Sequence, residues 1–535
     1  MNRNVKNKAI FEQLFLFISL ILSTLAFGFY YWVFHKVAVK KDLAFLLQEG
    51  IENLKSESLF FSSSLLIGYL KAFPLLGVAY LISCLLFVFY FKRSLGWDFF
   101  KVSKAMRLLL VFTAFIFVYN NTLSSFNYFT EQWYFTERML LLISAIGLYH
   151  TPMALLAYLP TLFLSFASFN FPFDSFSITD KMLPFTILTF TLCSSMLYLL
   201  TYRWLSVIKF ERLWVFGCLI IVCCSYLSPA LIKMKIAPHY FDWFLIEDFT
   251  LAFRKYLNRG WMLNINPESI EAVKQLLHTF QKPFLFFAFI IELLGVLLFF
   301  HWRYSVKILI LFIVLNTGIF FLSAIFFWKW IMFNLLLIGY LIWTKPKLNS
   351  NYNLSLVGVC VFFSLLSPLF PKLGWYSLPY MLEYEIKVTD INGQEKPIQG
   401  KDMAPFDIYF TFSRWNVFNE KQLSNATLEP SEVFLIREMS IAQIKEYQQK
   451  KGINKFNANA MMVLEVFLKE YFSNYNNTLR SPHLFIKPKS HIQKESKSPF
   501  LFDQEVKSLK IIAQESWFST VEQKSKEHTL KVLEF

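Results

Sequence analysis

Charged residues and glycine are scarce in this chain. Only 17% of its 535 residues are Asp, Glu, Lys or Arg, and it has 16 glycines. Soluble domains usually carry about 25% charged residues and about 7% glycine. Hydrophobic residues make up 56% of the chain and aromatic residues 19%. This composition excludes an ordinary soluble globule and predicts a mainly α, polytopic helical membrane protein.

Cysteine is also scarce, and every cysteine lies inside an apolar run. The six are Cys84, Cys193, Cys218, Cys223, Cys224 and Cys360. The chain has no CxxC motif, no Cys/His metal spacing and no glycine-rich phosphate loop. We therefore expect no disulfide, no structural zinc and no other metal site.

The net charge of +15 raises the question of nucleic-acid binding. From Tyr376 onward, 21 basic residues are balanced by 20 acidic ones, so the excess lies between the apolar runs of the first 375 residues. A basic excess in such loops is the positive-inside signature of membrane proteins. We therefore expect a lipid bilayer as partner and no nucleic acid.

The apolar runs predict nine or ten transmembrane helices. The run 139–168 contains Pro152 and Pro160, which favour a kinked or re-entrant hairpin there. The complete set of runs is 12–34, 66–91, 108–119, 139–168, 183–202, 213–232, 284–300, 305–327, 328–343 and 354–370.

Charge also predicts the orientation in the membrane. Basic residues precede the first run, which lacks a cleavage site and is typical of an uncleaved signal anchor, so the N-terminus should be cytoplasmic. The loop 120–137 has no Lys or Arg and should be outside. The segment 36–64 has the spacing of an amphipathic helix on that outer surface.

Four regions follow from these patterns. Residues 1–212 are expected to hold the N-terminal transmembrane helices, 213–343 a membrane core, and 344–375 the last transmembrane helix with a linker. Residues 376–535 should form an extracytoplasmic α+β domain, with a hairpin turning at Asn392-Gly393. A strand is also expected at DIYFTF, residues 407–412.

Two ionisable residues lie within or beside the apolar runs of the core. Lys233 directly follows the run 213–232, and Glu292 lies inside FIIELLGVLLFF. A charge at membrane depth costs about 2.5–3.5 kcal/mol, so it is retained where it has a partner or a task. We expect the two to approach each other. Two interpretations of Lys233 are open. Desolvation favours the neutral amine of a lysine, which can abstract a proton. Alternatively, a lysine at a helix end extends its ammonium group to the lipid headgroups.

The order of motifs in this core resembles a known family. SPALIKM is followed by Asp242-Trp243, then by YLNRGW (Tyr256 to Trp261), FIIELLGVLLFF and LNTGIFF. This order is similar to the membrane core of vitamin K-dependent gamma-glutamyl carboxylase and of bacterial proteins with the horizontally transferred transmembrane (HTTM) domain. The resemblance covers 213–343 and implies a bacterial inner-membrane protein.

The resemblance also implies roles for residues. Lys233 corresponds to the proposed catalytic base, although Lys235 is two residues away, and Glu292 corresponds to an acidic residue of the next helix. Asn316 stands where much of the family has histidine, which weakens the expectation of reduced vitamin K or another quinone as cofactor. The substrate site would be lined by Asp242, Trp243, Arg259, Trp261 and Asn316.

Three hypotheses for function therefore stand beside one another. The first is an enzyme acting on a lipid-soluble or envelope substrate, with gamma-carboxylase-like lyase or ligase chemistry and an intramembrane lysine base. The second is a transporter or lipid-handling protein that uses a Lys/Glu pair in a cavity. The third is a structural partner that binds envelope proteins through residues 376–535.

Overall fold

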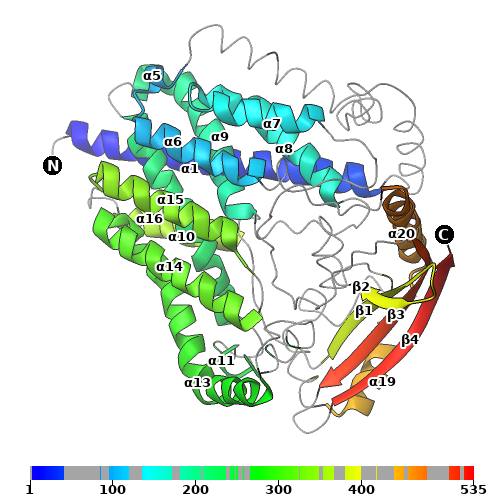
Figure 1. Ribbon diagram of the computed structural model, residues 1–535. Coiled ribbons are helices and arrows are strands. Elements are labelled where there is room, and N and C mark those ends of the chain that lie inside the picture. The colour runs from blue at the N-terminus through cyan, green and yellow to red at the C-terminus, as the bar shows by residue number, and fades with distance from the viewer. Residues whose placement is uncertain are drawn as a thin grey trace.

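The structure, a computed structural model, has a helical bundle and a small sheet beside it (Figure 1). It describes residues 3–40, 85, 96–119, 135–170, 181–205, 209–235, 241, 243–246, 249–250, 253, 257, 266–323, 326–348, 353–366, 380–398, 417, 436, 439–450, 456–478, 505–518 and 523–534. The expected run 66–91 lies almost wholly outside this set, as do residues 41–64 of the expected amphipathic segment and the expected strand 407–412.

Among the described residues, five helices are long and apolar enough to cross a membrane. They are α1 (Arg3–Lys40), α9 (Met182–Leu205), α10 (Phe210–Lys235), α13 (Pro267–Leu293) and α14 (Trp302–Ser323). Shorter apolar helices are found in α7 (Phe135–Gly147), α8 (Leu155–Asn170), α15 (Trp328–Thr344) and α16 (Asn353–Leu366). This is the architecture of an integral membrane protein, and it confirms the mainly helical fold predicted from composition. Helix α13 starts earlier than its apolar run suggested, since the helix includes the polar residues from Pro267.

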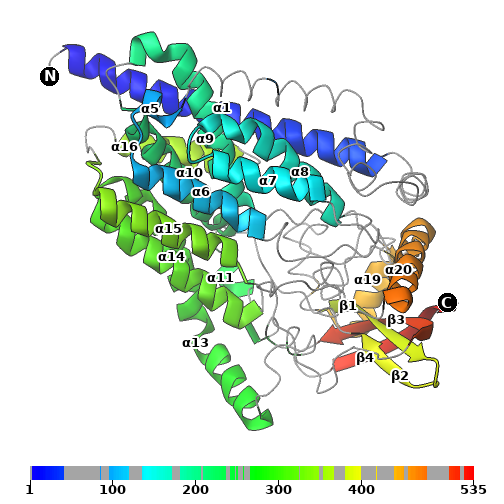
Figure 2. The ribbon, with the colours of Figure 1, turned by 45° about the horizontal axis from the view of Figure 1, so that its top comes forward.

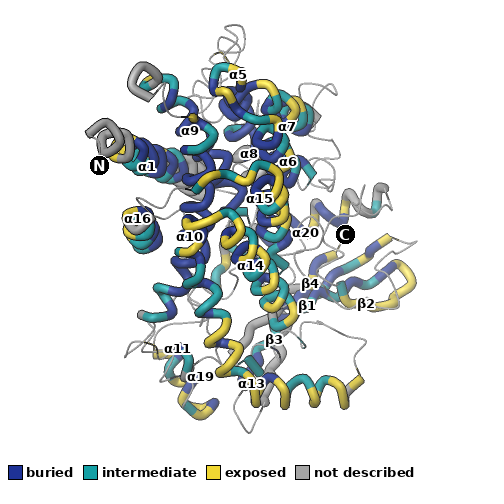
Figure 3. The backbone as a smooth tube through the Cα atoms, turned by 90° about the vertical axis from the view of Figure 1, so that its left-hand side faces the viewer, coloured by how far each residue is buried: buried dark blue, intermediate teal, exposed yellow. Residues whose placement is uncertain are grey.

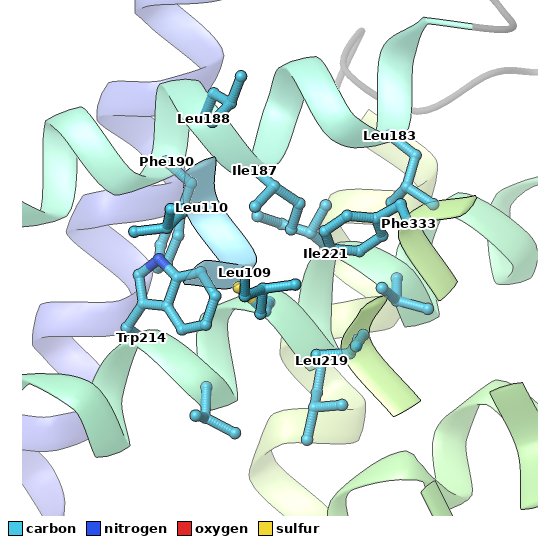
Figure 4. Packing of buried hydrophobic residues seen from close by; sticks show 14 of the residues in the cluster. Leu109, Leu110, Leu183, Ile187, Leu188, Phe190, Trp214, Leu219, Ile221 and Phe333 are labelled. Atoms are coloured by element: carbon cyan, nitrogen blue, oxygen red, sulfur yellow. The ribbon is translucent and has the colours of Figure 1, made fainter. Parts of the chain in front are cut away.

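The core of the bundle is built around α10, of whose apolar span 89% is buried. Figure 4 shows Trp214 and Ile221 of α10 among side chains of α6 (Lys104–Val118), α9 and α15 (Trp328–Thr344). The indole of Trp214 donates to Thr191 Oγ1 at 2.8 Å, which satisfies its buried N–H. A Cβ added at Gly217 would lie 2.0 Å from the Phe190 ring, so only glycine allows α9 this close.

The outer faces of α13, α14 and α15 remain apolar and exposed (Figure 3). The exposed fraction is 61% for Phe287, 57% for Val314 and 69% for Trp343. An exposed apolar surface on helices of this length is what a bilayer covers, so these helices present the lipid-facing side of the central bundle.

The run 139–168 is interrupted, as its prolines indicated. Helix α7 (Phe135–Gly147) is followed by a turn, the short 3-10 helix η2 (Pro152–Ala154) and α8 (Leu155–Asn170), and α7 packs against α8. Trp97, in α5 (Trp97–Phe100), anchors the turn: its indole donates to Leu148 O at 2.6 Å and its backbone N–H donates to His150 O at 3.0 Å.

The first turn of α10 is tied to three other helices through carboxylates. Glu211 accepts hydrogen bonds from the Ser103 backbone at 2.9 Å, the Ser103 hydroxyl at 2.5 Å and the Tyr340 hydroxyl at 2.8 Å. Arg212 lies 3.5 Å from Glu12 of α1. Since Ser103 caps α6 and Tyr340 lies near the end of α15, this end of the bundle gathers the start of α1, α6 and α10.

Helix α16 (Asn353–Leu366) lies parallel to α10 through a row of small polar side chains. Cys224 Sγ donates to Cys360 O at 3.5 Å, and Ser228 Oγ donates to Ser364 O at 3.0 Å. Both pairs span the same sequence separation of 136 residues, so the helices run in the same direction and in register. Small residues let membrane helices approach closely.

The C-terminal region has an antiparallel sheet in the order β2-β1-β3-β4. The strands are β1 (Tyr380–Asp390), β2 (Glu395–Ile398), β3 (Val506–Phe518) and β4 (Gln523–Glu534). The expected hairpin is present: Gly393 has φ 80° and its N–H donates to Asp390 O at 3.0 Å.

Two helices accompany this sheet, α19 (Ile441–Lys450) and α20 (Ala458–Thr478) (Figure 2). Lys445 of α19 lies 4.3 Å from the centre of the Trp517 ring in β3. Asn476 of α20 exchanges two hydrogen bonds with the Val506 backbone, at 2.8 and 2.9 Å. In Figures 1 and 2 the sheet lies at the end of the bundle opposite the N-terminus of α1.

Candidate functional site

Lys233 and Glu292 form a buried ion pair where α10 meets α13. Lys233 Nζ lies 2.6 Å from Glu292 Oε1, and the two side chains are 9% and 6% exposed. The structure therefore brings together the two residues that sequence reasoning placed at the centre of the site. Burial strengthens their attraction but removes the hydration of both charges.

The end of α10 explains how Lys233 is enclosed. The helix continues past Pro229 to Lys235, and the Phe241 N–H donates to Met234 O in its last turn at 3.2 Å. Phe241 has φ 73°, a left-handed conformation that is uncommon for an aromatic residue. The short helix α11 (Trp243–Ile246) begins two residues after Phe241, and its Trp243 ring lies against Lys233 in the last turns of α10.

Trp243 covers the ammonium group. Lys233 Nζ lies 4.7 Å from the centre of the Trp243 ring, and Trp243 is 3% exposed. Beside it, Phe244 and Phe289 meet edge to face with ring centres 5.4 Å apart. A cation over an aromatic face gains about 0.5–2 kcal/mol, more when water is excluded. The aromatic side chains therefore replace water as the surroundings of the lysine.

Glu292 lies at the point where its α-helix changes into a 3-10 helix. Helix α13 ends at Leu293 and continues as a six-residue 3-10 helix, η3 (Leu294–Phe299), although 3-10 segments longer than three or four residues are uncommon. One oxygen of Glu292 binds Lys233. Within the described part of the chain, the other oxygen, Oε2, is buried and has no hydrogen-bond partner. The carboxylate is therefore only half satisfied.

A second polar group lies on the same face of α10, about two turns before Lys233. The Tyr226 hydroxyl accepts hydrogen bonds from Asn316 Nδ2 of α14 at 2.7 Å and from Asn334 Nδ2 of α15 at 3.0 Å. The exposed fractions of these three residues are 3%, 3% and 0%. Sequence reasoning missed Tyr226 and Asn334, although the helical spacing between Tyr226 and Lys233 was a usable signal.

The other expected site residues divide into two groups. The structure brings Trp243 to the pair and Asn316 to Tyr226. Asp242, Arg259 and Trp261 lie outside the described residues, as does the side chain of Lys235. Lys329, at the start of α15, is only 1% exposed and lies 4.8 Å from the centre of the Trp328 ring.

The arrangement is suited to proton exchange. At 2.6 Å, the ammonium and the carboxylate are close enough for a proton to pass between them with little displacement of heavy atoms. The described residues contain no cluster of three or more His, Cys, Asp or Glu side chains that fits a metal ion.

Fold and composition define an integral membrane protein with a helical bundle and a small antiparallel sheet. No family model, curated protein or solved structure matches the chain. The helical membrane architecture is thus established without a family assignment.

Proposed function

We propose that this membrane protein acts on a lipid-soluble substrate at the Lys233–Glu292 pair, with Lys233 as the base. The observation that carries the proposal is the 2.6 Å contact between two side chains that are both more than nine-tenths buried. Trp243 and Asn316 are proposed to shape the substrate side of this site, together with Asp242, Arg259 and Trp261.

Energetics favour a functional role over a purely structural one. A buried ion pair gains little net stability, because the desolvation of both charges offsets their attraction, and apolar replacements are often neutral or stabilising. A pair that served only packing would therefore be readily replaced by apolar residues. Ionisable residues at membrane depth more commonly mark substrate or proton sites.

The chemistry of the substrate follows from the surroundings. Glu292 lies on α13, whose outer face is apolar and exposed like that of α14, and we propose that an apolar molecule approaches the pair from this lipid-facing side. On the strength of the resemblance in residues 213–343, we propose carboxylase-like chemistry, with proton abstraction by Lys233 as its first step. This resemblance implies a quinone as the cofactor. The presence of Asn316 in place of the family's histidine weakens that expectation.

Charge supports an orientation for the bundle. The end that contains Glu211 also holds Arg107, Arg212, Arg303 and Lys345, together with the start of α1. Basic residues gather on the cytoplasmic side. We therefore propose an N-terminus in the cytoplasm and, for a bacterial inner membrane, residues 376–535 outside it, where they are available to an envelope partner. The division at residues 212, 343 and 375 is part of the same proposal.

The test measures whether Lys233 acquires a neutral amine. Purified protein in lipid nanodiscs is labelled with phenyl isothiocyanate over a range of pH, and the labelled lysines are quantified by peptide mass spectrometry. Lys233 is expected to react at the pH where Lys235 reacts or below it, and Glu292→Gln should lower its midpoint further. A Lys233 that stays unlabelled at pH values where Lys235 is fully labelled overturns the lysine-base proposal.

Lipid extraction provides the second arm of that test. A lipid-soluble molecule that co-purifies with the native protein, and is lost from Lys233→Met but retained in Lys235→Met, supports a substrate site at the pair. Equal retention in both variants contradicts it. The comparison also identifies the substrate chemically, because the extracted molecule is analysed by mass spectrometry.

Transport is the second candidate, and the backbone beside the pair favours it. Pro229 lies in α10 and the 3-10 segment η3 follows Glu292, and such irregularities occur where membrane helices bend. Against transport, residues 219–224 between the two polar ends of α10 are fully buried and mostly aliphatic. Voltage-dependent charge movement in reconstituted protein, abolished by Glu292→Gln, would favour the transporter.

A further inference from the structure

Helix α13 and its continuation η3 are longer than one membrane crossing needs. They run from Pro267 to Phe299, which at about 1.5 Å per α-helical residue and about 2 Å per 3-10 residue is about 50 Å of helix. The hydrocarbon core of a bilayer is about 30 Å thick. The part from Pro283 to Phe299 is by itself about 28 Å long, which is enough to cross, so residues 267–282 are left for another task.

Pro283 separates these two parts of the helix. A proline inside a helix removes one backbone hydrogen bond and bends the axis. Figures 1 and 3 show the first half of α13 turned away from the line of the second half. The first half is therefore a segment with its own direction.

The end of α14 marks the level of this first half. Helix α14 has 22 residues and is about 33 Å long, so it reaches from one boundary of the hydrocarbon core to the other. Phe320 and Leu322, in its last turn, pack against the cluster of Phe253 and Leu277. Because Leu277 belongs to α13, residues 267–282 lie beside the point where α14 leaves the hydrocarbon core.

The first half of α13 has a packed face and a polar face. Ile270 and Val273 lie with Leu277 on one side of the helix and pack in the same cluster. Gln275 and Thr279 are exposed and lie on the opposite side. Water can cover the polar face at a membrane boundary.

A third face is an exposed apolar ridge. Leu276 is 49% exposed, Phe280 47% and Phe284 41%, at intervals of four residues along one side of the helix. Phe287, which is 61% exposed, continues the ridge onto the lipid-facing side of the crossing part. The ridge is thus continuous with a surface that the bilayer covers, and water is a poor solvent for it.

We propose that residues 267–282 form an interfacial helix that lies in the headgroup layer of the membrane. Leu276 and Phe280 insert toward the acyl chains, while Gln275 and Thr279 face water. Helices of this kind bury their apolar face about 5–10 Å into the boundary between headgroups and acyl chains. This membrane-surface site is separate from the function proposed for the Lys233–Glu292 pair and does not depend on it.

The charges of the segment indicate which lipids it needs. Residues 267–282 contain two acidic residues, Glu268 and Glu271, and two lysines, Lys274 and Lys282. Glu271 and Lys274 pair at 3.3 Å. Since the acidic residues and the lysines balance, apolar insertion holds the helix, and anionic lipid is not required. We expect the same placement in phosphatidylcholine alone and in mixtures with phosphatidylglycerol.

Spin labels on the full-length protein in phosphatidylcholine nanodiscs test the placement. The variants Leu276→Cys and Phe280→Cys carry a nitroxide on the ridge, and Gln275→Cys and Thr279→Cys are matched controls one position away. Collisions with oxygen, which concentrates in the bilayer, and with a water-soluble nickel chelate are measured after subtraction of the signal from the unsubstituted protein.

Labels on the ridge should collide more often with oxygen and less often with nickel than labels on the polar face. Equal nickel collision at all four positions overturns the proposal, because the ridge then faces water. Loss of both collisions at positions 276 and 280 also overturns it, since a second protein molecule then covers the ridge. A ridge that inserts only when phosphatidylglycerol is present contradicts the predicted independence from anionic lipid.

Photo-crosslinking of the unsubstituted protein gives a second measurement that no folding defect can confuse. The nanodiscs contain phosphatidylcholine with a diazirine near the glycerol end of one acyl chain, and adducts are located by peptide mass spectrometry. Adducts are expected on Leu276 and Phe280, with none on the exposed Ala272 and Gln275 of the polar face. Labelling of Phe287 without any adduct in 267–282 overturns the interfacial placement, whatever the chemistry of Lys233.

Discussion

The two ends of α10 handle a carboxylate in different ways. At the first turn, both oxygens of Glu211 are used, by three donors from Ser103 and Tyr340. At the last turn, Glu292 faces Lys233 with one oxygen and leaves the other without a partner in the described structure. A fully satisfied carboxylate fixes helices in place, whereas a half-satisfied buried one keeps capacity for a proton or a ligand.

Removing Glu292 from the ion pair with Lys233 should have the largest effect on stability. Glu292→Leu leaves a buried ammonium without its partner and is expected to lower the free energy of unfolding by about 3–5 kcal/mol. The double variant Lys233→Met/Glu292→Leu should recover most of that loss, because it removes both charges. Thermal unfolding of the purified proteins in detergent measures both, and a double variant as unstable as the single one contradicts this account.

Weakening the hydrogen bonds of Glu211 at the first turn of α10 should lower the free energy of unfolding by less. Glu211→Gln weakens the hydrogen bonds to Ser103 and Tyr340, and a loss of about 1.5–3 kcal/mol is expected. The same unfolding experiment measures it. The labelling midpoint of Lys233 should stay unchanged in this variant, because Glu211 lies at the opposite end of α10. A shifted midpoint would show that Glu211 and the Lys233–Glu292 pair are energetically coupled, which contradicts this account.

The aromatic cover of the pair makes a smaller contribution. Trp243→Leu removes the ring from Lys233 and should cost about 1 kcal/mol through the cation–π contact, in addition to lost packing. Phe244→Leu removes a neighbouring ring without touching the ammonium, so it serves as the control for packing. Equal effects on the Lys233 labelling midpoint in the two variants would show that the contact with the cation has no separate role.

The smallest effect on stability is expected from Lys233→Arg. Arginine preserves the positive charge and the contact with Glu292 but stays protonated, so the protein should fold and insert normally while the proposed chemistry is lost. Lys235→Arg should retain function. Membrane insertion, thermal stability and the cellular phenotype of both variants are to be measured, and full function of Lys233→Arg would show that the lysine serves only as a charge.

Composition and periodicity were sufficient for the architecture. Within the described residues, apolar runs predicted the long helices of the bundle, the prolines of 139–168 predicted the interruption of that run, and Asn392-Gly393 predicted the hairpin between β1 and β2. These features depend on local chemistry, so one segment of sequence is enough to reveal them. The start of α13 at Pro267 was missed because its first turns are polar, although packing against the segment that contains Phe253 buries one side of them.

The site was only partly predictable. Lys233 and Glu292 were found because charge is expensive in a membrane, which makes each conspicuous on its own. Tyr226 and Asn334 were missed because tyrosine and asparagine occur in many membrane helices for unrelated reasons. Their hydrogen bonds form only when α10, α14 and α15 pack together, and a local stretch of sequence does not reveal such a tertiary contact.

The register between α10 and α16 has a consequence for biogenesis. Cys224 and Ser228 reach their carbonyl partners in Cys360 and Ser364, which are synthesised 136 residues later. Until α16 is made, the thiol and the hydroxyl on this side of α10 lack the carbonyl partners that they have in the folded protein. Helix α16 therefore completes the wall of the bundle late, and chains interrupted before Asn353 should be recognised by membrane quality control as unfinished.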